Sequence, residues 1–348
     1  MSKKIIAKRF KENSRIRIFF IGKINLSIGS DRLFAFNFSK FLNLLPSVNS
    51  KLIDDYKEDL NAEIMIFKKS YPIQKIIQIK NQRKDVLIGI INPSDKCRGL
   101  LDIVDFAIVG SVEEKAYYSK YLKCFIYPLI EEVPNHLITE YNLRPKNEIC
   151  YHGNKQHLDL IDINIEKALT KLVEEGYQVK AIYDFKTLGK SKKKFITKHV
   201  QWDYENWLNQ ISFSTIGICP VSHYSGKIRK NIAKFFHIKK QNKNDFLFQY
   251  KNTNNASRAF VFHQLKIPVV SEIGGSFHHI MGDETAGLMC YSEKSWYESI
   301  KKLSLDEEFA FNLSEKAFFL MNSLYDPEIW CKRFIDDLKV WGNNKFIY

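Results

Sequence analysis

Short apolar runs alternate with helix-length segments along nearly the whole chain, and this alternation restricts the fold more than any other feature. In the first part of the chain the runs are residues 15–22, 62–67, 86–91, 106–111 and 124–130. Strands of a parallel sheet read as continuous apolar runs because helices cover both faces of the sheet. The alternation therefore predicts an α/β protein with doubly wound, Rossmann-like sheets.

The pattern starts again after a proline-containing connector, with runs at 148–154, 177–185, 195–202, 214–221, 267–272 and 286–292. A chain of 348 residues is also long for one core, since single cores usually stop growing at about 300 residues. We therefore predict two domains, residues 1–145 and 146–325, that face a central cleft. Residues 326–348 form a predicted terminal helix, which begins near Asp326 and Pro327 and packs back on the first domain.

The chain is strongly basic, with a formal net charge of +14 and a pI near 9.3, and this favours anionic partners. Nucleic acid, acidic lipid headgroups and phosphorylated small molecules all meet that condition. The chain contains neither paired CxxC and HxxxH motifs nor an aromatic RNP-like strand, so nucleic acid is not an expected partner. A solvated, lysine-rich surface is the simpler explanation of the charge.

The 6 cysteines are scattered singly, several of them inside apolar runs. This spacing is typical of buried thiols and fits neither a disulfide framework nor a zinc site, so no metal is predicted. The basic N-terminus contains no apolar segment long enough for a signal peptide or a spanning helix. We expect a cytoplasmic protein, and peripheral attachment to an anionic membrane at its inner face stays open.

A glycine turn follows the first predicted strand, in the sequence NLSIGSDR. Gly29 and Ser30 lead into Asp31, which can accept a proton, and Arg32, which can hold an anion. The alternative is that Ser30 or Asp31 only caps the following helix. Because caps are common, the cap is favoured over a catalytic base.

The corresponding turn of the second domain is YHGNKQH. Backbone N–H groups after its glycine can bind a phosphate at a helix N-terminus, with Asn154 in the turn and Lys155 adding charge. The alternative is a turn with exposed polar residues. Further along, the basic loop CPVSHYSGKIRKN offers Lys227 and Arg229 as secondary candidates for binding a diphosphate.

The strongest local signal is the stretch NNASRAF before the run at 267–272. It predicts a helix that begins near Ser257 and places Arg258 in its first turn, where the helix dipole disfavours a cation. A bound anion would remove that conflict, and Asn255 can contribute to the same site. A Gly274–Gly275 turn and His278 follow the next predicted strand.

From Ser257 onward the sequence SRAFVFHQLKIPVVSEIGGSFHHIMGDETAGLMCYS resembles the donor-domain segment of GT-B glycosyltransferases of the broad family-4 (group 1) type. The resemblance extends to STIGICPV, to YHGN at the opening of the second domain, to SIGSDR after the first strand, and to the closing YDPEIW. Nearly the whole chain follows the order of motifs in that family. The resemblance thus predicts a GT-B fold whose C-terminal helix crosses back to the N-terminal domain.

The resemblance implies an enzyme that binds a nucleoside diphosphate sugar in its second domain and a glycan or lipid-linked acceptor in its first. Asn154, Lys227, Arg229, Asn255, Ser257, Arg258, Gly274, Gly275 and His278 would then bind the donor, and Gly29, Ser30 and Arg32 would form the acceptor-side loop, with Asp31 as the base. Helix N–H groups with Arg or Lys can stabilise a leaving diphosphate without a metal or another cofactor. The chain also contains no Asp-x-Asp triplet.

The sequence departs from the family at its glutamate pair, whose positions fall on Thr253 and Val261. His278 replaces a further glutamate after the Gly-Gly turn. A catalytically silent GT-B-like protein that binds nucleotide or glycan is therefore the main alternative. A nucleotide-sugar epimerase is disfavoured because no acidic pair is placed to exchange a proton at a sugar carbon.

Overall fold

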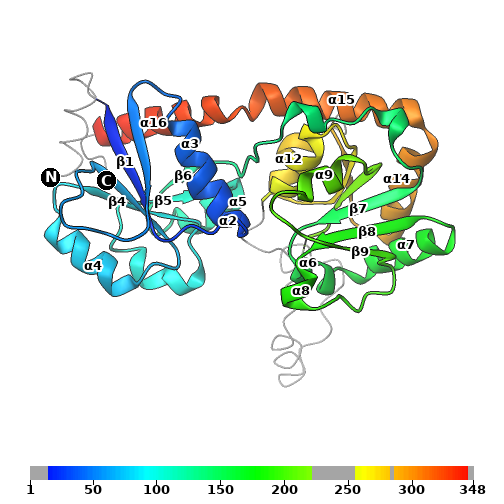
Figure 1. The fold of residues 1–348 in the computed structure, drawn as a ribbon, viewed down its shortest axis with the longest axis horizontal. Helices are drawn as coiled ribbons and strands as arrows, with labels where there is room; N and C mark the ends of the chain where they lie inside the picture. The colour runs from blue at the N-terminus through cyan, green and yellow to red at the C-terminus, as the bar shows by residue number, and fades with distance from the viewer. Residues whose placement is uncertain (1–14, 222–254, 283–285, 344–348) are drawn as a thin grey trace. The chain divides into compact units, whose positions relative to one another are not determined.

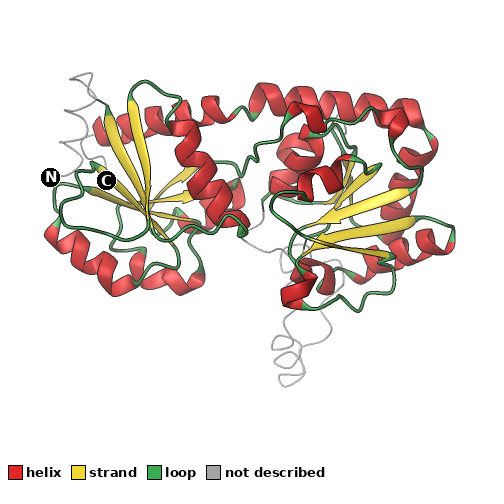
Figure 2. Cartoon of the chain, viewed as in Figure 1, coloured by secondary structure: helices red, strands yellow, loops and turns green. Residues whose placement is uncertain are grey.

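The computed structural model describes residues 15–221, 255–282 and 286–343. The chain divides into two compact units, Met1–Glu132 with Asn322–Tyr348, and Val133–Met321. The first division falls after Glu132, earlier than the 145/146 boundary expected from the connector. Each unit is built on one sheet that helices flank (Figures 1 and 2).

The sheet of the first unit has the strand order β2-β1-β3-β4-β5-β6, and each strand pairs in parallel with its neighbours. Its strands are β1 Ile16–Ile21, β2 Val48–Ile53, β3 Ile64–Lys68, β4 Leu87–Ile91, β5 Phe106–Val109 and β6 Lys123–Ile126. The doubly wound parallel sheet predicted from the apolar runs is confirmed. Edge strand β2 was not predicted, because Asn49, Ser50 and Lys51 interrupt its apolar pattern.

The helical segments of this unit are α2 Gly29–Asp31, η1 Arg32–Asn37, α3 Phe38–Leu42, α4 Ile73–Gln82, η2 Asp95–Leu100, α5 Val112–Tyr118 and α16 Pro327–Asn343. The first three are continuous, and η1 is a π-helical segment. Phe38 stacks on Tyr127 with ring centroids 3.7 Å apart and meets Phe334 of α16 edge-on. The terminal helix thus packs into the core of the first unit.

The second sheet has the order β12-β11-β10-β7-β8-β9, again with parallel pairings. Its strands are β7 Glu148–His152, β8 Gln178–Tyr183, β9 Lys198–Gln201, β10 Ile216–Cys219, β11 Val269–Glu272 and β12 Leu288–Cys290. The helices are η3 Asn135–Leu137, η4 Tyr141–Leu143, α6 Lys155–Asp159, α7 Ile163–Glu174, α8 Phe185–Leu188, α9 Trp207–Ser212, α12 Ser257–Gln264, α13 Gly275–Met281, α14 Glu293–Leu305 and α15 Glu307–Leu324. Each apolar run predicted for this half lies on one of these strands.

Helix α12 packs directly on strand β10 because position 217 carries no side chain. A Cβ on Gly217 would lie 2.5 Å from the ring of Phe262, closer than real side-chain contacts allow. Phe262 and Ala259 are fully buried in this contact. The glycine therefore fixes the helix against the sheet and with it the position of the helix N-terminus.

All 6 cysteines are buried and free, which confirms the prediction of buried thiols. No helix in the described part of the chain is both long and apolar enough to cross a membrane.

Candidate functional site

The second sheet changes its direction of winding between β7 and β10, which are neighbours in the sheet although β8 and β9 lie between them in sequence. In open α/β sheets, ligands bind beyond the carboxyl ends of the strands at such a switch point. Gly153 follows the carboxyl end of β7, and Pro220 and Val221 follow the carboxyl end of β10. Helix α12 begins after the same strand end, as the sequence predicted.

Arg258 joins the two strand ends at the switch point. Its Nη2 donates a hydrogen bond to the carbonyl oxygen of Pro220 at 2.6 Å, and its guanidinium lies over the ring of Tyr151, 5.4 Å from the centroid. Its Nη1 is enclosed and makes no hydrogen bond within the described residues. The guanidinium therefore retains a hydrogen-bond donor that none of the described groups accepts.

The first turn of α12 adds unpaired backbone donors beside this cation. Ala256 is the N-cap and no side chain caps the helix, so the N–H groups of Arg258 and Ala259 have no acceptor in the described part of the chain. Asn255 Oδ1 accepts a hydrogen bond from Ser257 Oγ at 2.8 Å. These groups and the positive end of the helix dipole favour a bound anion.

The Arg258 side chain lies against Tyr151 and Gly153. A Cβ on Gly153 would be 3.2 Å from Arg258 Cδ and 3.2 Å from Tyr151 Oη, and its φ of +134° disfavours any side chain. Burial raises the pKa of Tyr151 to about 12, although nearby Arg258 opposes that shift. Tyr151 is therefore a neutral platform at physiological pH.

Asn154 and Lys155 are engaged locally. Asn154 caps α6, because its Oδ1 accepts a hydrogen bond from Gln156 N at 2.9 Å. Lys155 Nζ donates to the carbonyl oxygen of Leu188 at 2.9 Å and lies 3.6 Å from Asp159. The Asn154 side chain thus has its partner in α6, and the Lys155 side chain has partners in α6 and α8.

The predicted Gly-Gly turn is the start of a helix. Gly274 is the N-cap of α13, Gly275 is its first residue, and His278 is exposed on it. This helix follows β11, the strand beside β10, so it starts at the same edge of the sheet. Lys227, Arg229 and Thr253 lie outside the described residues, and Val261 is buried within α12.

Glu272 at the end of β11 was not identified from the sequence. It is buried, and its Oε2 accepts a hydrogen bond from Val221 N at 2.9 Å, which fixes the chain as it leaves β10. An acidic residue that ends an apolar run was the available signal.

The first sheet has its switch point between β1 and β3, and Asp31 lies beside it. The capping interpretation is wrong, because Ile28 is the N-cap of α2 and no side chain caps this helix. Asp31 is buried and forms an ion pair with Lys68 at the end of β3, and its Oδ2 accepts a hydrogen bond from Asn25 N at 3.1 Å. Lys68 was missed, although it too ends an apolar run.

Arg32 is part of a buried ion pair and not an open cation. Its Nη2 lies 2.8 Å from Glu131, and its Nη1 donates to the carbonyl oxygen of Leu26 at 2.7 Å. Asn37 also donates to Glu131, at 3.1 Å. In this structure Arg32 anchors the Gly29–Asp31 turn to the chain at Glu131.

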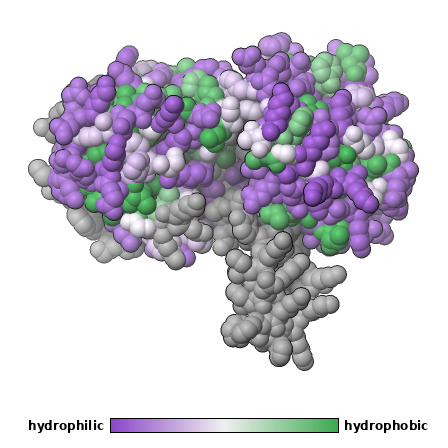
Figure 3. Space-filling view, turned by 60° about the horizontal axis from the view of Figure 1, so that its bottom comes forward, coloured by the Kyte–Doolittle hydropathy of each residue, from purple (hydrophilic) through white to green (hydrophobic). Residues whose placement is uncertain are grey.

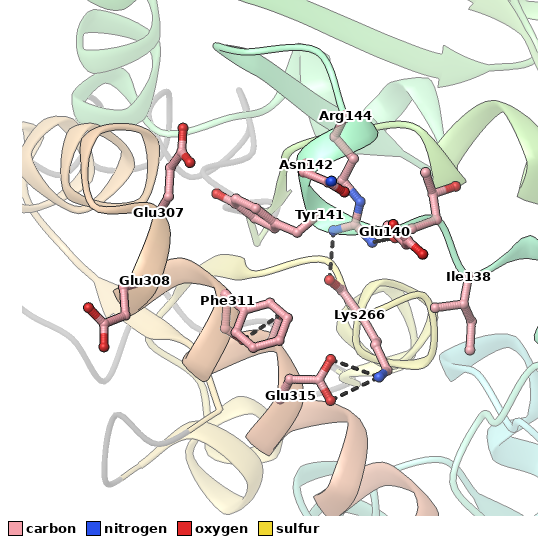
Figure 4. Close-up of a pocket in the computed structure, with 12 residues that line it drawn as sticks. Ile138, Glu140, Tyr141, Asn142, Arg144, Lys266, Glu307, Glu308, Phe311 and Glu315 are labelled. Atoms are coloured by element: carbon pink, nitrogen blue, oxygen red, sulfur yellow. Dashed lines mark hydrogen bonds and ion pairs between the residues drawn. The ribbon is translucent and has the colours of Figure 1, made fainter.

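A separate groove of about 700 Å³ lies near the amino ends of strands β7 and β11, away from the switch point at their carboxyl ends (Figure 4). Its lining comes from the segment before β7, from Lys266 before β11 and from the start of α15. Lys266 pairs with Glu315 at 2.7 Å, and burial lowers the pKa of Arg144 to about 10. None of the site residues predicted from the sequence lines this groove.

The sequence resemblance implies that a nucleoside diphosphate binds at this switch point, and we expect Gly153→Ala to lower the affinity for it about tenfold. The methyl group would displace Arg258 and strain the turn, which also lowers the free energy of unfolding by about 1–2 kcal/mol. Gly176→Ala is the matched control, since Gly176 has a φ of +93° but its Cβ would meet open space. Calorimetric titration of both variants checks this, and an equal loss of affinity in both would contradict it.

No protein-family model and no curated protein sequence matches the chain. Several solved structures match it over nearly the whole length of both chains. A glycosyltransferase from Rickettsia africae is 11% identical with a TM-score of 0.62, covering 95% of this chain and 100% of that one. Sucrose-phosphate synthase from Thermosynechococcus elongatus is 10% identical with a TM-score of 0.61, covering 94% and 99%.

HepE from Anabaena, in complex with UDP-glucose, is 6% identical with a TM-score of 0.61, covering 94% of this chain and 100% of that one. At such identities the similarity is evidence of fold. Together with the two parallel doubly wound sheets, it shows that this chain has the GT-B fold of glycosyltransferases.

Proposed function

We propose that the protein is a glycosyltransferase that moves a sugar from a nucleoside diphosphate sugar to a hydroxyl of a glycan or lipid-linked acceptor. The single observation that carries this proposal is Arg258, whose guanidinium lies at the switch point of the second sheet with a donor that no group in residues 15–221, 255–282 or 286–343 accepts. That position is where an open α/β sheet binds a phosphorylated ligand. HepE, which shares the fold, is described in complex with UDP-glucose.

Departure of the sugar leaves negative charge on the diphosphate. We propose that Arg258 and the N–H groups at the start of α12 stabilise that charge in the transition state without a metal ion, which the positive end of the helix dipole supports. We assign the donor site further to Asn154, Asn255, Ser257, Gly274, Gly275 and His278, and we keep Lys227 and Arg229, which lie outside the described residues, as candidates from the sequence.

We propose Asp31 as the base that accepts the proton of the acceptor hydroxyl, with Gly29, Ser30 and Arg32 forming the loop around it. Asp31 is buried beside the switch point of the first sheet, where it pairs with Lys68. Asp31→Asn should lower transfer about 100-fold while nucleotide affinity stays unchanged. Lys40→Gln, which removes the exposed Lys40–Glu132 pair, is the control. Undiminished transfer by Asp31→Asn would remove Asp31 from the mechanism.

The alternative function is a catalytically silent protein that binds nucleotide or glycan. The specific observation behind it is Val261, which occupies one family glutamate position and is 4% exposed, so it offers no polar contact to a donor. Saturable nucleotide binding without sugar transfer to any offered acceptor would favour this alternative.

We further propose that the protein works in the cytoplasm and contacts the inner face of an anionic membrane. Six buried free thiols suit a reducing compartment, and a net charge of +14 suits an acidic surface. Vesicle binding, described below, tests the membrane contact.

A further inference from the structure

Exposed lysines are concentrated in one short segment of the second unit, from α8 to the start of β9. Lys186, Lys190, Lys192, Lys194 and Lys198 are all exposed. In the described part of the chain none of them forms an ion pair with a carboxylate. We call these five residues the lysine surface.

The acidic groups around the lysine surface already have other partners. Glu166 pairs with Lys193 at 2.6 Å, and Asp159 accepts a hydrogen bond from Ser191 Oγ at 2.6 Å. Asp184 accepts hydrogen bonds from Gln201 and Thr187. The donors to Asp184 are neutral, so its carboxylate still offsets part of the charge of nearby Lys186. The five lysines together nevertheless leave this surface with a net positive charge, which gains from an external anionic surface.

Hydrogen bonds hold the segment in a defined conformation. Tyr183 Oη lies 2.7 Å from His199 Nδ1 and accepts a hydrogen bond from Ser191 N at 2.8 Å. Lys186 N donates to Gln201 Oε1 at 3.0 Å. The lysines are thus presented from an ordered scaffold at the edge of the second sheet.

Exposed aliphatic side chains lie next to the lysine surface. Leu188 at the end of α8 is 47% exposed, and Leu160 and Ile163, between α6 and α7, are 37% and 52% exposed. The hydrogen bond from Lys155 on α6 to the Leu188 carbonyl joins the two segments, which lie side by side in Figure 1. In the view of Figure 3 the described surface is largely hydrophilic, with separate hydrophobic patches.

We propose that the lysine surface, with Leu160, Ile163 and Leu188, docks the protein on an anionic lipid bilayer. The inference rests on the membrane contact proposed above and names the surface that makes it. Lysines attract acidic headgroups, while aliphatic side chains enter the headgroup boundary. Nucleic acid is a poorer fit, because single-strand binding uses exposed aromatic rings for stacking, and these exposed apolar side chains are aliphatic.

The test is co-sedimentation with vesicles of phosphatidylglycerol mixed with phosphatidylcholine, compared with vesicles of phosphatidylcholine alone. One variant changes all five residues of the lysine surface to Gln. The control variant changes the same number of exposed lysines elsewhere to Gln, at Lys51, Lys57, Lys84, Lys316 and Lys332. We expect the first variant to lose at least ~10-fold in partitioning to anionic vesicles, at least three times the loss of the control.

Equal losses in the two variants would overturn the assignment of the surface. Failure of wild type to bind anionic vesicles, or binding to RNA but not to vesicles, would overturn both the surface and the membrane contact. Sugar transfer is measured separately on a water-soluble acceptor, so loss of docking with intact transfer is distinguishable from failure of the proposed enzyme activity.

Discussion

Arg258→Ala is expected to weaken the binding of a nucleoside diphosphate by at least ~100-fold, equivalent to about 3 kcal/mol. The guanidinium has an enclosed Nη1 that finds no acceptor among the described residues, and it is held by Pro220 and Tyr151, so its position is set before a ligand binds. Charge-assisted hydrogen bonds to phosphate are about twice as strong as neutral ones. Calorimetric titration with the preferred nucleotide measures the loss.

Two companion variants make this result specific. Arg258→Lys keeps the charge but loses the planar fork, so it should recover only part of the affinity. Arg15→Ala, at an exposed position in the first unit, should bind as wild type does. Wild-type affinity in folded Arg258→Ala would contradict the assignment of the site.

His263→Leu is expected to change how stability depends on pH. His263 is fully buried in α12, and this burial lowers its pKa to about 3, although the Ala286 backbone opposes the shift. The unfolded chain binds a proton below its ordinary pKa of 6.5, while the folded chain does not until about pH 3. The contribution of this group is thus complete above pH 6.5 and is lost progressively as the pH falls.

At about 1.4 kcal/mol per pH unit, wild type should lose about 3 kcal/mol at pH 4 from this one group, and His263→Leu should not. Urea unfolding of both proteins at pH 7 and pH 4 gives the comparison. His136→Leu, at an exposed histidine of the same unit, is the control and should follow the wild-type pH dependence. Parallel pH profiles for wild type and His263→Leu would contradict the expectation.

The sequence was most informative where periodicity is strong. Apolar runs located both sheets, and the cluster before Phe260 located the start of α12 and Arg258 in its first turn. Local patterns carry this information because a buried strand or a helix start depends on a few adjacent residues. Edge strand β2 gives no such local signal, because an edge strand needs no continuous apolar run, and it was therefore missed.

Contacts between distant segments were not predictable from one sequence. A cap at Ser30 or Asp31 was favoured over a base at Asp31, because nothing adjacent to Asp31 indicates its pairing with Lys68. Arg32 was interpreted as an anion ligand, yet its partner Glu131 lies far along the chain. Both pairs form only when the strands of the first sheet come together, so their recognition requires the topology.

Sugar transfer itself is the most direct test of the proposed function. Purified protein is incubated with UDP-, GDP-, ADP- and TDP-linked sugars and a panel of glycan and lipid-linked acceptors, and both nucleotide release and product mass are measured. The proposal predicts one donor class whose nucleoside diphosphate is released in step with a glycosylated acceptor, and loss of that product in Arg258→Ala. Nucleotide binding without any glycosylated product, on folded protein and across the panel, would contradict it and favour the silent GT-B protein.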